Sequence, residues 1–433
     1  MTRCVVWFLL LAACAGTAWA QAPAPADCDA PAFERRLRSA EALDARAYWL
    51  DRELLKWPGA SPDGRFRLYH SASASILAGP GEKVRGADGA FALEAYVAAL
   101  PEQLARRFRF VADGPLLRLP KGSMKLAELH QRQLVLVQED AAGRVIRATA
   151  LQAAGALDDL YGAAAAVEDL GARPGPRGTG FKLWAPTARE VSVCIYASGD
   201  GQARAVAPMR FDARMGVWSH SKPEDLSGSY YTYLVDVFVP RIGLVRNRVT
   251  DPYSISLTAD SRRSYIGDLS ASRLKPEGWG HSAAPTTAPA ATDMVIYELH
   301  VRDFSINDDN VRPGYRGKYL AFTEHNSNGM NHLRALTQAG LTDVHLLPVF
   351  DFASVPESGC VTPNPQGAPD GPQRQAVAAA AKAGDCFNWG YDPFHYTAPE
   401  GSYATDTADG ARRVVEFRRM VMALHQAGLR VGM

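Results

Sequence analysis

Two stretches rich in proline, glycine and alanine divide this chain into segments that differ in their hydrophobic period. The first is Gly171-Ala-Arg-Pro-Gly-Pro-Arg-Gly178, and the second is His281–Thr292. Proline lacks a backbone N–H and glycine has an unrestricted backbone, so we expect these stretches to be linkers rather than helices or central strands. Two linkers predict three domains, which agrees with a length of 433 residues, since domains average roughly 150 residues.

The composition excludes several classes of protein. Apolar residues make up 47% of the chain and charged residues 21%, as in ordinary globular proteins rather than disordered ones. Forty-seven basic residues almost balance 46 acidic ones, and no run of lysine or arginine marks a nucleic-acid-binding or membrane-binding surface. After residue 20 no apolar stretch approaches the length of a transmembrane helix, so we do not expect a multi-span membrane protein.

The first twenty residues have the pattern of an export signal. Arg3 precedes the short apolar run Cys4–Ala15, and Ala18-Trp-Ala20 has the small-x-small form of a cleavage site. Leu11-Ala-Ala-Cys14 also resembles a bacterial lipobox, in which Cys14 would carry a lipid anchor; this is the only membrane attachment that we expect. Both alternatives predict export, to the periplasm, to the outer membrane as a lipoprotein, or to the medium.

Export implies an oxidising environment, in which cysteines form disulfides. Cys360 and Cys386 flank the insertion Val361–Asp385, which is rich in proline, glycine and alanine, and we predict a disulfide at the base of this insertion. A metal site is the weaker alternative there, because no histidine or second close cysteine completes a ligand set. Cys194 lies in an alternating segment, and we expect it to be a buried thiol.

The two N-terminal segments differ in pattern. Residues 28–165 predict a mixed domain, with a helical stretch at Pro31–Leu54, strands at Phe66–His70 and Leu134–Glu139, and the alanine-rich Ala148–Ala166 closing the unit. Residues 179–275 alternate between apolar and polar positions, as in Val191, Val193 and Ile195 and again from Tyr231 to Val239. This period of two predicts an all-β, immunoglobulin-like sandwich.

From residue 294 onwards strands and helices alternate, which predicts parallel strands that are buried on both faces. The expected elements are a strand at Met294–His300, a helix at Met330–Ala339, a strand at Asp343–Leu347, a helix at Thr407–Ala427 and a strand at Leu429–Met433. Residues 294–433 are too few for a closed (β/α)8 barrel, which takes about 250 residues. We therefore expect an incomplete (β/α)8 barrel in a sequence that stops at the opening of a strand.

Several motifs resemble those of bacterial type I pullulanases, which are starch-debranching enzymes of glycoside hydrolase family 13. Asp44-Ala-Arg-Ala-Tyr-Trp-Leu-Asp51 with Lys56-Trp-Pro58 resembles their N-terminal domain. Gly180–Thr187 and Val249–Ser254 resemble their carbohydrate-binding module of family 48, and Ile296–Ser305 resembles the first barrel strand. The most specific motif is Phe387-Asn-Trp-Gly-Tyr-Asp-Pro393, which is similar to the hallmark Tyr-Asn-Trp-Gly-Tyr-Asp-Pro of this family.

The resemblance implies hydrolysis of α-1,6-glucosidic bonds in pullulan, amylopectin or glycogen by a retaining mechanism. In the family the catalytic Asp, Glu and Asp lie on later barrel strands, so we assign no catalytic residue, do not expect Glu298 and Asp303 to form a catalytic pair, and expect this sequence by itself to be inactive. The alternatives are a non-catalytic exported α-glucan-binding protein or another family 13 activity, that of an isoamylase or branching enzyme. No organic cofactor is implied; calcium is left open, with Asp260, Asp308 and Asp309 as candidate ligands.

The best candidate binding residues are Asn388, Trp389, Tyr391 and Asp392. A sugar ring has apolar C–H faces and a polar rim, so a recognition loop needs an aromatic side chain beside hydrogen-bonding groups. The resemblance implies that Tyr391 stacks on a glucose ring, while Asn388 and Asp392 offer hydrogen bonds. Trp184 and Trp218 are also aromatic, but their places in apolar strands favour a role in the core. The scattered histidines, including His300 and His395, have no metal-ligand spacing.

Overall fold

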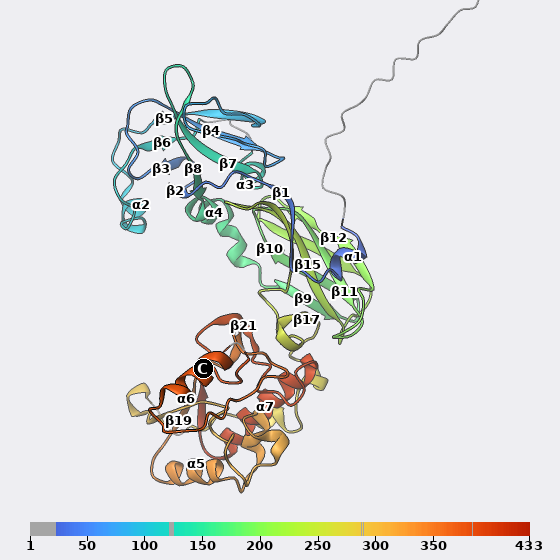
Figure 1. Cartoon of the computed structure of the whole chain (residues 1–433). Helices are drawn as coiled ribbons and strands as arrows, with labels where there is room; N and C mark the ends of the chain where they lie inside the picture. The colour runs from blue at the N-terminus through green and yellow to red at the C-terminus, as the bar shows by residue number, and fades with distance from the viewer. Residues whose placement is uncertain (1–22, 121–124, 287, 289, 383) are drawn as a thin grey trace, which may run out of the picture.

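The computed structural model describes residues 23–120, 125–286, 288, 290–382 and 384–433. The predicted export signal, its cleavage site after Ala20 and the lipobox cysteine Cys14 lie outside these residues. Three bodies follow one another along the molecule: a β-barrel, a β-sandwich and a mixed α/β region (Figure 1). Among the residues described, no helix combines the length and the apolar character needed to cross a bilayer.

The first body is a closed barrel in the strand order β2-β3-β6-β5-β4-β7-β8. Its strands are β2 Ala45–Trp49, β3 Leu54–Lys56, β4 Arg65–Ser71, β5 Gly89–Ala95, β6 Leu116–Arg118, β7 Gln133–Glu139 and β8 Val145–Gln152. Around them lie the short helices α2 Glu102–Arg107, α3 Leu126–His130 and α4 Ala154–Tyr161. The predicted strands at 66–70 and 134–139 are confirmed as β4 and β7, but the region is mostly β rather than mixed.

The predicted helix at Pro31–Leu54 is wrong. In β2 the side chains of Ala47 and Trp49 are fully buried, whereas Arg46 is exposed and Tyr48 is only half-buried, so the burial has a period of two. The preceding strand β1, Glu34–Ser39, has no apolar face at all; its backbone pairs antiparallel with β16 of the sandwich. The segment therefore contributes strands to two bodies: β1 belongs to the sandwich sheet and β2 belongs to the barrel.

The second body is a sandwich of two antiparallel sheets. One sheet has the order β1-β16-β15-β11-β12, with β17 added to β15, and the other has the order β13-β14-β10-β9. Apart from β1, the strands of these two sheets are β9 Gly171–Gly175, β10 Gly178–Trp184, β11 Ala188–Tyr196, β12 Ala205–Pro208, β13 Arg210–Asp212, β14 Val217–Lys222, β15 Tyr230–Val239, β16 Gly243–Val249 and β17 Ser264–Tyr265. The alternating residues around Val193 and Tyr233 are buried between the sheets, which confirms the predicted all-β sandwich.

The first predicted linker is not a linker. Residues 171–175 form β9, which pairs antiparallel with β10, and Gly178 begins β10 with a φ of 132°, a conformation that only glycine adopts readily. Pro174 fits because β9 is the last strand of its sheet, where a missing backbone donor removes no bond to a further strand. The sequence pattern correctly excluded a central strand and missed an edge strand.

Cys194 is buried, as expected, but it is not a free thiol. It forms a disulfide with Cys28, which ends the short helix α1, Pro25–Cys28. Next to the disulfide the backbone carbonyl of Cys28 accepts a hydrogen bond of 2.7 Å from the Tyr196 hydroxyl. Arg246 binds Asp236 through two hydrogen bonds and reaches Asp27 as well. The N-terminal segment is thus fixed to the sandwich by covalent, ionic and backbone interactions.

The third body contains a parallel sheet in the order β18-β19-β22. Its elements are β18 Ile296–Leu299, α5 Asn328–Gln338, β19 Asp343–Leu346, β20 Phe350–Phe352, α6 Pro372–Ala381, β21 Pro393–Pro399, α7 Gly410–Gln426 and β22 Arg430–Gly432. The predicted parallel pairing is confirmed. A complete barrel is not present among the described residues; the observed unit is a three-stranded sheet with α5 and α7.

The parallel strands are not all buried on both faces. Met330 and Leu333 of α5 and Met420 and Leu424 of α7 pack in one core with Val344 of β19. The outer strand β18 instead leaves Ile296 49% exposed. Three of the four residues of β19 are buried and His345 is half-buried, whereas three of the four residues of β18 are exposed. The expectation of two buried faces is therefore met in part by β19 and fails for β18.

His130 makes the barrel sensitive to acid. This side chain lies in α3 against Trp49, at 4.5 Å between ring centres, and burial lowers its pKa to about 4. The unfolded chain, with a histidine pKa of about 6.5, binds this proton more readily, so stability is complete above that pH and falls as the pH falls toward 4. We expect His130→Phe to reduce this loss by up to ~3 kcal/mol, as measured from urea unfolding at pH 7 and pH 4.5.

The matched control is His281→Phe, because His281 is exposed to solvent. Its unfolding free energy should respond to pH as that of the unmodified chain does. Equal acid sensitivity of the His130→Phe variant and the unmodified chain would show that another group causes the loss.

Candidate functional site

The predicted binding loop lies at the carboxyl-terminal edge of the parallel sheet. His300 directly follows β18 and Pro348 lies just beyond β19, and both contact the loop at residues 387–392. In sheets of parallel strands this edge is where functional side chains gather, because the loops that leave the strands meet there.

Gly390 gives the loop its shape. Its φ is +84°, and a Cβ atom at this position would lie 2.9 Å from the carbonyl oxygen of Pro348 and 3.0 Å from the ring of Phe352. Both the backbone conformation and the close packing therefore require glycine. The turn at Gly390 separates the side chains of Trp389 and Tyr391, which are 59% and 65% exposed.

The polar residues of the loop bind one another. The side-chain amide of Asn388 donates to Asp392 Oδ1 at 3.0 Å and also to the hydroxyl of Ser354, which in turn donates to Asp392 Oδ2. Asn388 Oδ1 accepts a 2.8 Å hydrogen bond from the backbone N–H of Gly390. Asn388 and Asp392 thus hold the loop in place, and Ser354, which the sequence did not indicate, joins them.

His300 anchors the loop from the sheet. The backbone N–H of Asp303 donates to His300 Nδ1 at 3.3 Å, so the ring proton is on Nε2 and is donated to the backbone carbonyl of Asn388 at 2.8 Å. The Tyr403 hydroxyl lies 3.1 Å from the same nitrogen, and the ring of Phe387 packs against His300 at 5.5 Å. The position of His300 at the end of the predicted strand Met294–His300 was the sequence signal for this role.

A disulfide joins Cys360 and Cys386 beside this loop. The bond closes the base of the insertion at 361–385, and a backbone hydrogen bond of 2.8 Å from Val361 to Gly384 lies next to it. The insertion contains α6, which has no buried residue. The covalent bond therefore fixes the segment that leads directly into the binding loop.

Among the remaining aromatic and acidic candidates, Trp218, Asp308 and Asp303 have structural partners. Trp218 is buried in the sandwich core, with its indole N–H donating to the Ala185 carbonyl at 2.9 Å, and Trp184 is half-buried in the adjacent strand β10. Asp308 accepts hydrogen bonds from the backbone and side chain of Asn328 at the start of α5. Asp303 pairs with Arg302 at 3.0 Å.

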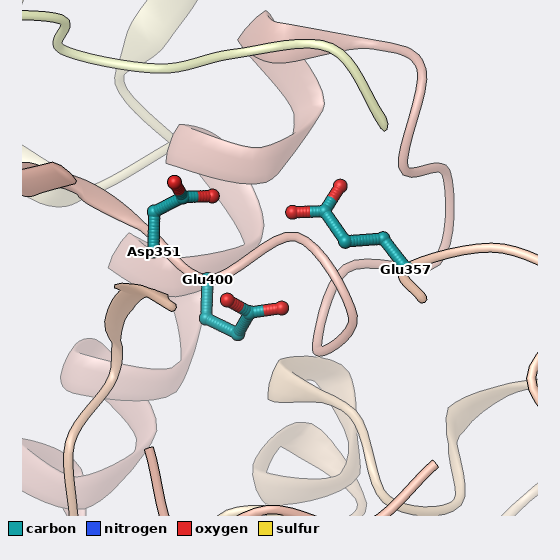
Figure 2. Close-up of side chains that lie close together, drawn as sticks. All are labelled: Asp351, Glu357 and Glu400. Carbon is teal, nitrogen blue, oxygen red and sulfur yellow. The ribbon is translucent and has the colours of Figure 1, made fainter. Parts of the chain in front are cut away.

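A buried group of charges lies where the sandwich meets the third body. Asp351 of β20, Glu357 and Glu400 approach one another from three chain segments, and one potential ligand oxygen from each lies within 4.8 Å of the others (Figure 2). The guanidinium of Arg413, in α7, binds Glu357 at 2.6 Å and Asp351 at 3.3 Å. We call these three acids with Arg413 the interface charge cluster.

Contacts from the sandwich complete the interface charge cluster. The Ser261 hydroxyl donates to Asp351 at 2.6 Å and the backbone N–H of Asp260 donates to Glu357 at 3.0 Å. Burial raises the pKa of Glu357 to about 8 and that of Glu400 to about 7, against the opposing attraction of Arg413. Sequence analysis named Asp260 but none of the three buried acids. These acids are 6 to 49 positions apart in the chain, so no local motif brings them together.

Two family models match the chain. The model of the Pullulanase N2 domain matches residues 44–159, which hold the closed barrel, and the model of Carbohydrate-binding module 48 (Isoamylase N-terminal domain) matches residues 169–254, which hold most of the sandwich. Both agree with the resemblance that the sequence motifs suggested.

Relatives extend the match into the third body. A pullulanase from Klebsiella pneumoniae is 36% identical over 428 residues, which covers 88% of this chain and 38% of the relative. The chain is a homologue of the N-terminal portion of pullulanases. Pullulanase 1, chloroplastic, from Arabidopsis thaliana is 38% identical to this homologue over 396 residues, which covers 89% of the chain and 40% of the relative.

Solved pullulanase structures have the same fold. The apo pullulanase from Klebsiella pneumoniae aligns with a TM-score of 0.81 at 35% identity, covering 92% of this homologue and 48% of that chain. A second Klebsiella pneumoniae structure, complexed with maltotriose, aligns with a TM-score of 0.80 at 36% identity and covers 91% and 41% of the two chains. The homologue spans about two fifths of the length of the curated pullulanases it matches.

Replacing Gly390 should destabilise the loop. We expect Gly390→Ala to lower the free energy of unfolding by about 1–3 kcal/mol, because alanine at this φ is strained and its methyl group meets Pro348. Chemical denaturation measures the change. Gly384→Ala is the control, since its φ is not in the left-handed region and the nearest atom to its added Cβ lies 3.9 Å away. Equal destabilisation by the two variants would contradict the assigned role of Gly390.

Proposed function

We propose that this pullulanase homologue binds α-glucan through the loop at residues 387–392, as part of an enzyme that hydrolyses α-1,6-glucosidic bonds of pullulan, amylopectin or glycogen with catalytic acids that the resemblance places on later barrel strands. The main support for this proposal is a pair of exposed aromatic side chains, those of Trp389 and Tyr391. Their loop is held at the sheet edge by Gly390, Asn388 and His300. A fixed aromatic ring loses little entropy when a sugar stacks on it, so this arrangement favours carbohydrate.

The comparisons support a glucan as the ligand. One Klebsiella pneumoniae pullulanase was solved with maltotriose, and the sandwich matches a carbohydrate-binding module. Tyr391 supplies the stacking surface in this proposal, and Asp392 and Asn388 add hydrogen bonds through the carboxylate and amide oxygen lone pairs that the contacts within the loop leave free. The retaining mechanism and the hydrolase activity rest on the family resemblance.

We also propose that the protein is exported. Two disulfides, Cys28–Cys194 and Cys360–Cys386, are suited to an oxidising compartment such as the periplasm or the medium. Cleavage after Ala20 and lipidation of Cys14 are both compatible with this proposal.

A second candidate function is glucan binding without catalysis. Retaining glycosidases need two carboxyl groups about 5–5.5 Å apart, one as nucleophile and one as acid. Near the loop, both oxygens of Asp392 already accept hydrogen bonds from Asn388 and Ser354, and Asp303 is paired with Arg302. These partners favour a positioning role for both acids, which leaves binding as the function that the described residues support by themselves.

Removing the ring of Tyr391 should weaken glucan binding. We expect Tyr391→Ala to raise the dissociation constant for maltotriose about tenfold, equivalent to ~1.4 kcal/mol, because a stacking surface is lost. Isothermal titration calorimetry measures the change. Tyr391→Phe keeps the ring and should bind like the unmodified chain, and Trp184→Phe serves as a control in the sandwich. Equal losses for Tyr391→Ala and Trp184→Phe would contradict the choice of this loop.

Release of reducing sugar from pullulan separates the two candidate functions. We expect the 433-residue chain to bind maltotriose but to release no reducing sugar, because its loop acids are engaged in structural hydrogen bonds. Turnover that persists in a Tyr391→Phe variant and disappears in an Asp392→Asn variant would instead show that this chain is catalytic by itself.

A further inference from the structure

An open hollow lies on the outer face of the sandwich sheet β13-β14-β10-β9. The alternate residues Thr179, Phe181 and Leu183 of β10 are buried in the sandwich. Gly180 and Lys182 lie between them and therefore face outward, since successive side chains of a strand point to opposite faces. A Cβ atom at Gly180 would meet no atom within 4 Å, and the hollow that this residue helps to line has a volume of about 560 Å³.

The other end of the same face is covered. Trp184, further along β10, is half-buried and pairs with Val217 of β14. Next to Val217, a Cβ atom at Gly216 would lie 2.9 Å from the ring of Tyr161, which belongs to α4 and is 2% exposed. The end around Gly180 has no such cover among the residues that the structure describes, so it is open to a ligand.

Three basic side chains, each from a different strand, line the hollow. Arg173 of β9 lies opposite Gly180 in the sheet. Lys182 of β10 lies opposite Ser219 of β14, and Ser219 lies opposite Arg210 of β13. Neighbouring strands are about 4.8 Å apart, and residues two positions apart along a strand are separated by about 6.6 Å. The long side chains of arginine and lysine span such distances, so all three basic groups can contact one small ligand above Gly180.

Acidic side chains do not balance these three positive charges. Asp169 also lines the hollow and binds Lys182 at 2.6 Å. Asp268 attracts Arg173, but it is not among the residues that line the hollow. Arg210 has no ion-pair partner in the part of the chain that the structure describes. The hollow therefore has an excess of positive charge, and we call it the basic hollow.

The lining of the basic hollow suits a phosphate ester better than a neutral sugar. A phosphate ester carries nearly two negative charges and three acceptor oxygens, and arginine binds phosphate through pairs of N–H groups. The hydroxyls of Ser219 and Ser221 add two further donors. A neutral sugar needs an aromatic surface, but Phe181, the phenylalanine of the described lining, is fully buried, and no tyrosine or tryptophan joins it there.

We infer that the basic hollow binds a phosphate ester carried by an α-glucan chain. Arg173, Lys182 and Arg210 balance the charge of the ester, the two serines donate hydrogen bonds, and the missing side chain of Gly180 leaves space for it. The inference rests on the proposed function for its glucan part. The basic hollow lies in the sandwich and the loop at residues 387–392 lies in the third body, so a phosphorylated glucan has a second place of attachment on the protein.

Affinity electrophoresis of the full chain tests this inference. One gel contains phosphorylated amylopectin, and a second contains the same polymer after treatment with a phosphatase. At low salt we expect the dissociation constant for the phosphorylated polymer to be about fivefold lower, because charge-assisted hydrogen bonds are added. Sodium chloride should reduce this difference, since salt screens exposed charges.

Two variants remove the basic hollow in different ways. Arg210→Gln deletes an exposed charge, and Gly180→Val fills the open space while all three basic groups remain. Both should bind the two polymers equally. Arg214→Gln is the matched control, because Arg214 is exposed in the turn between β13 and β14 and does not line the hollow, so this variant should keep the preference for phosphate. Tyr391→Ala should weaken binding of both polymers and leave their ratio unchanged.

Equal binding of the two polymers by the unmodified chain would overturn this inference and leave the proposed function intact. No binding of either polymer would contradict both. A preference for phosphate that persists in Arg210→Gln and in Gly180→Val would also overturn the inference, by placing the phosphate elsewhere. Inorganic phosphate is the remaining comparison: if it binds as tightly as the phosphorylated polymer, the ligand is free phosphate and the assignment to a glucan is wrong.

Discussion

The fully buried guanidinium of Arg413 connects the sandwich to the α/β region. It binds Glu357 and Asp351, and it also donates to the Thr258 carbonyl of the sandwich at 3.2 Å. A Cβ atom at Gly401 would lie 2.1 Å from a guanidinium nitrogen of Arg413. Glycine at this position therefore makes space for the Arg413 side chain. An unpaired buried charge is strongly destabilising, and the partners of Arg413 come from several segments that must therefore assemble together. The position of the proposed glucan-binding loop depends on the same segments, because β20 leads to Ser354 and β21 follows Asp392.

The sequence predicted elements whose period was clear and failed where backbone pairing decided the structure. Alternation around Val193 and Tyr233 predicted the sandwich, and the strand–helix order after residue 294 predicted the parallel sheet. The error at Pro31–Leu54 has a different origin: β1 contributes little buried surface and is held by its pairing with β16, an interaction that side-chain patterns do not record. Likewise Gly171–Gly175 looked like a linker because an edge strand tolerates proline.

The candidate site was predictable only in part. The motif placed Trp389 and Tyr391 on a loop, and both side chains are exposed there. The residues that fix the loop were not predictable, since Ser354 and His300 lie 34 and 88 positions before Asn388 in the sequence. The same holds for Cys194, whose partner Cys28 is 166 positions away. Local patterns show the chemistry that a segment offers, but contacts between distant segments depend on the tertiary fold.

The bond between Cys28 and Cys194 turns the first part of the chain into a covalent ring. The whole barrel, from β2 to β8, lies within that ring, because the chain leaves the sandwich after β1 and returns to it at β9. A protease that cuts one barrel loop therefore opens the ring but releases neither piece, and the N-terminal strand stays attached to the sandwich. A cut in a barrel loop therefore leaves the sandwich, the N-terminal strand and the third body, which carries the proposed glucan-binding loop, covalently connected.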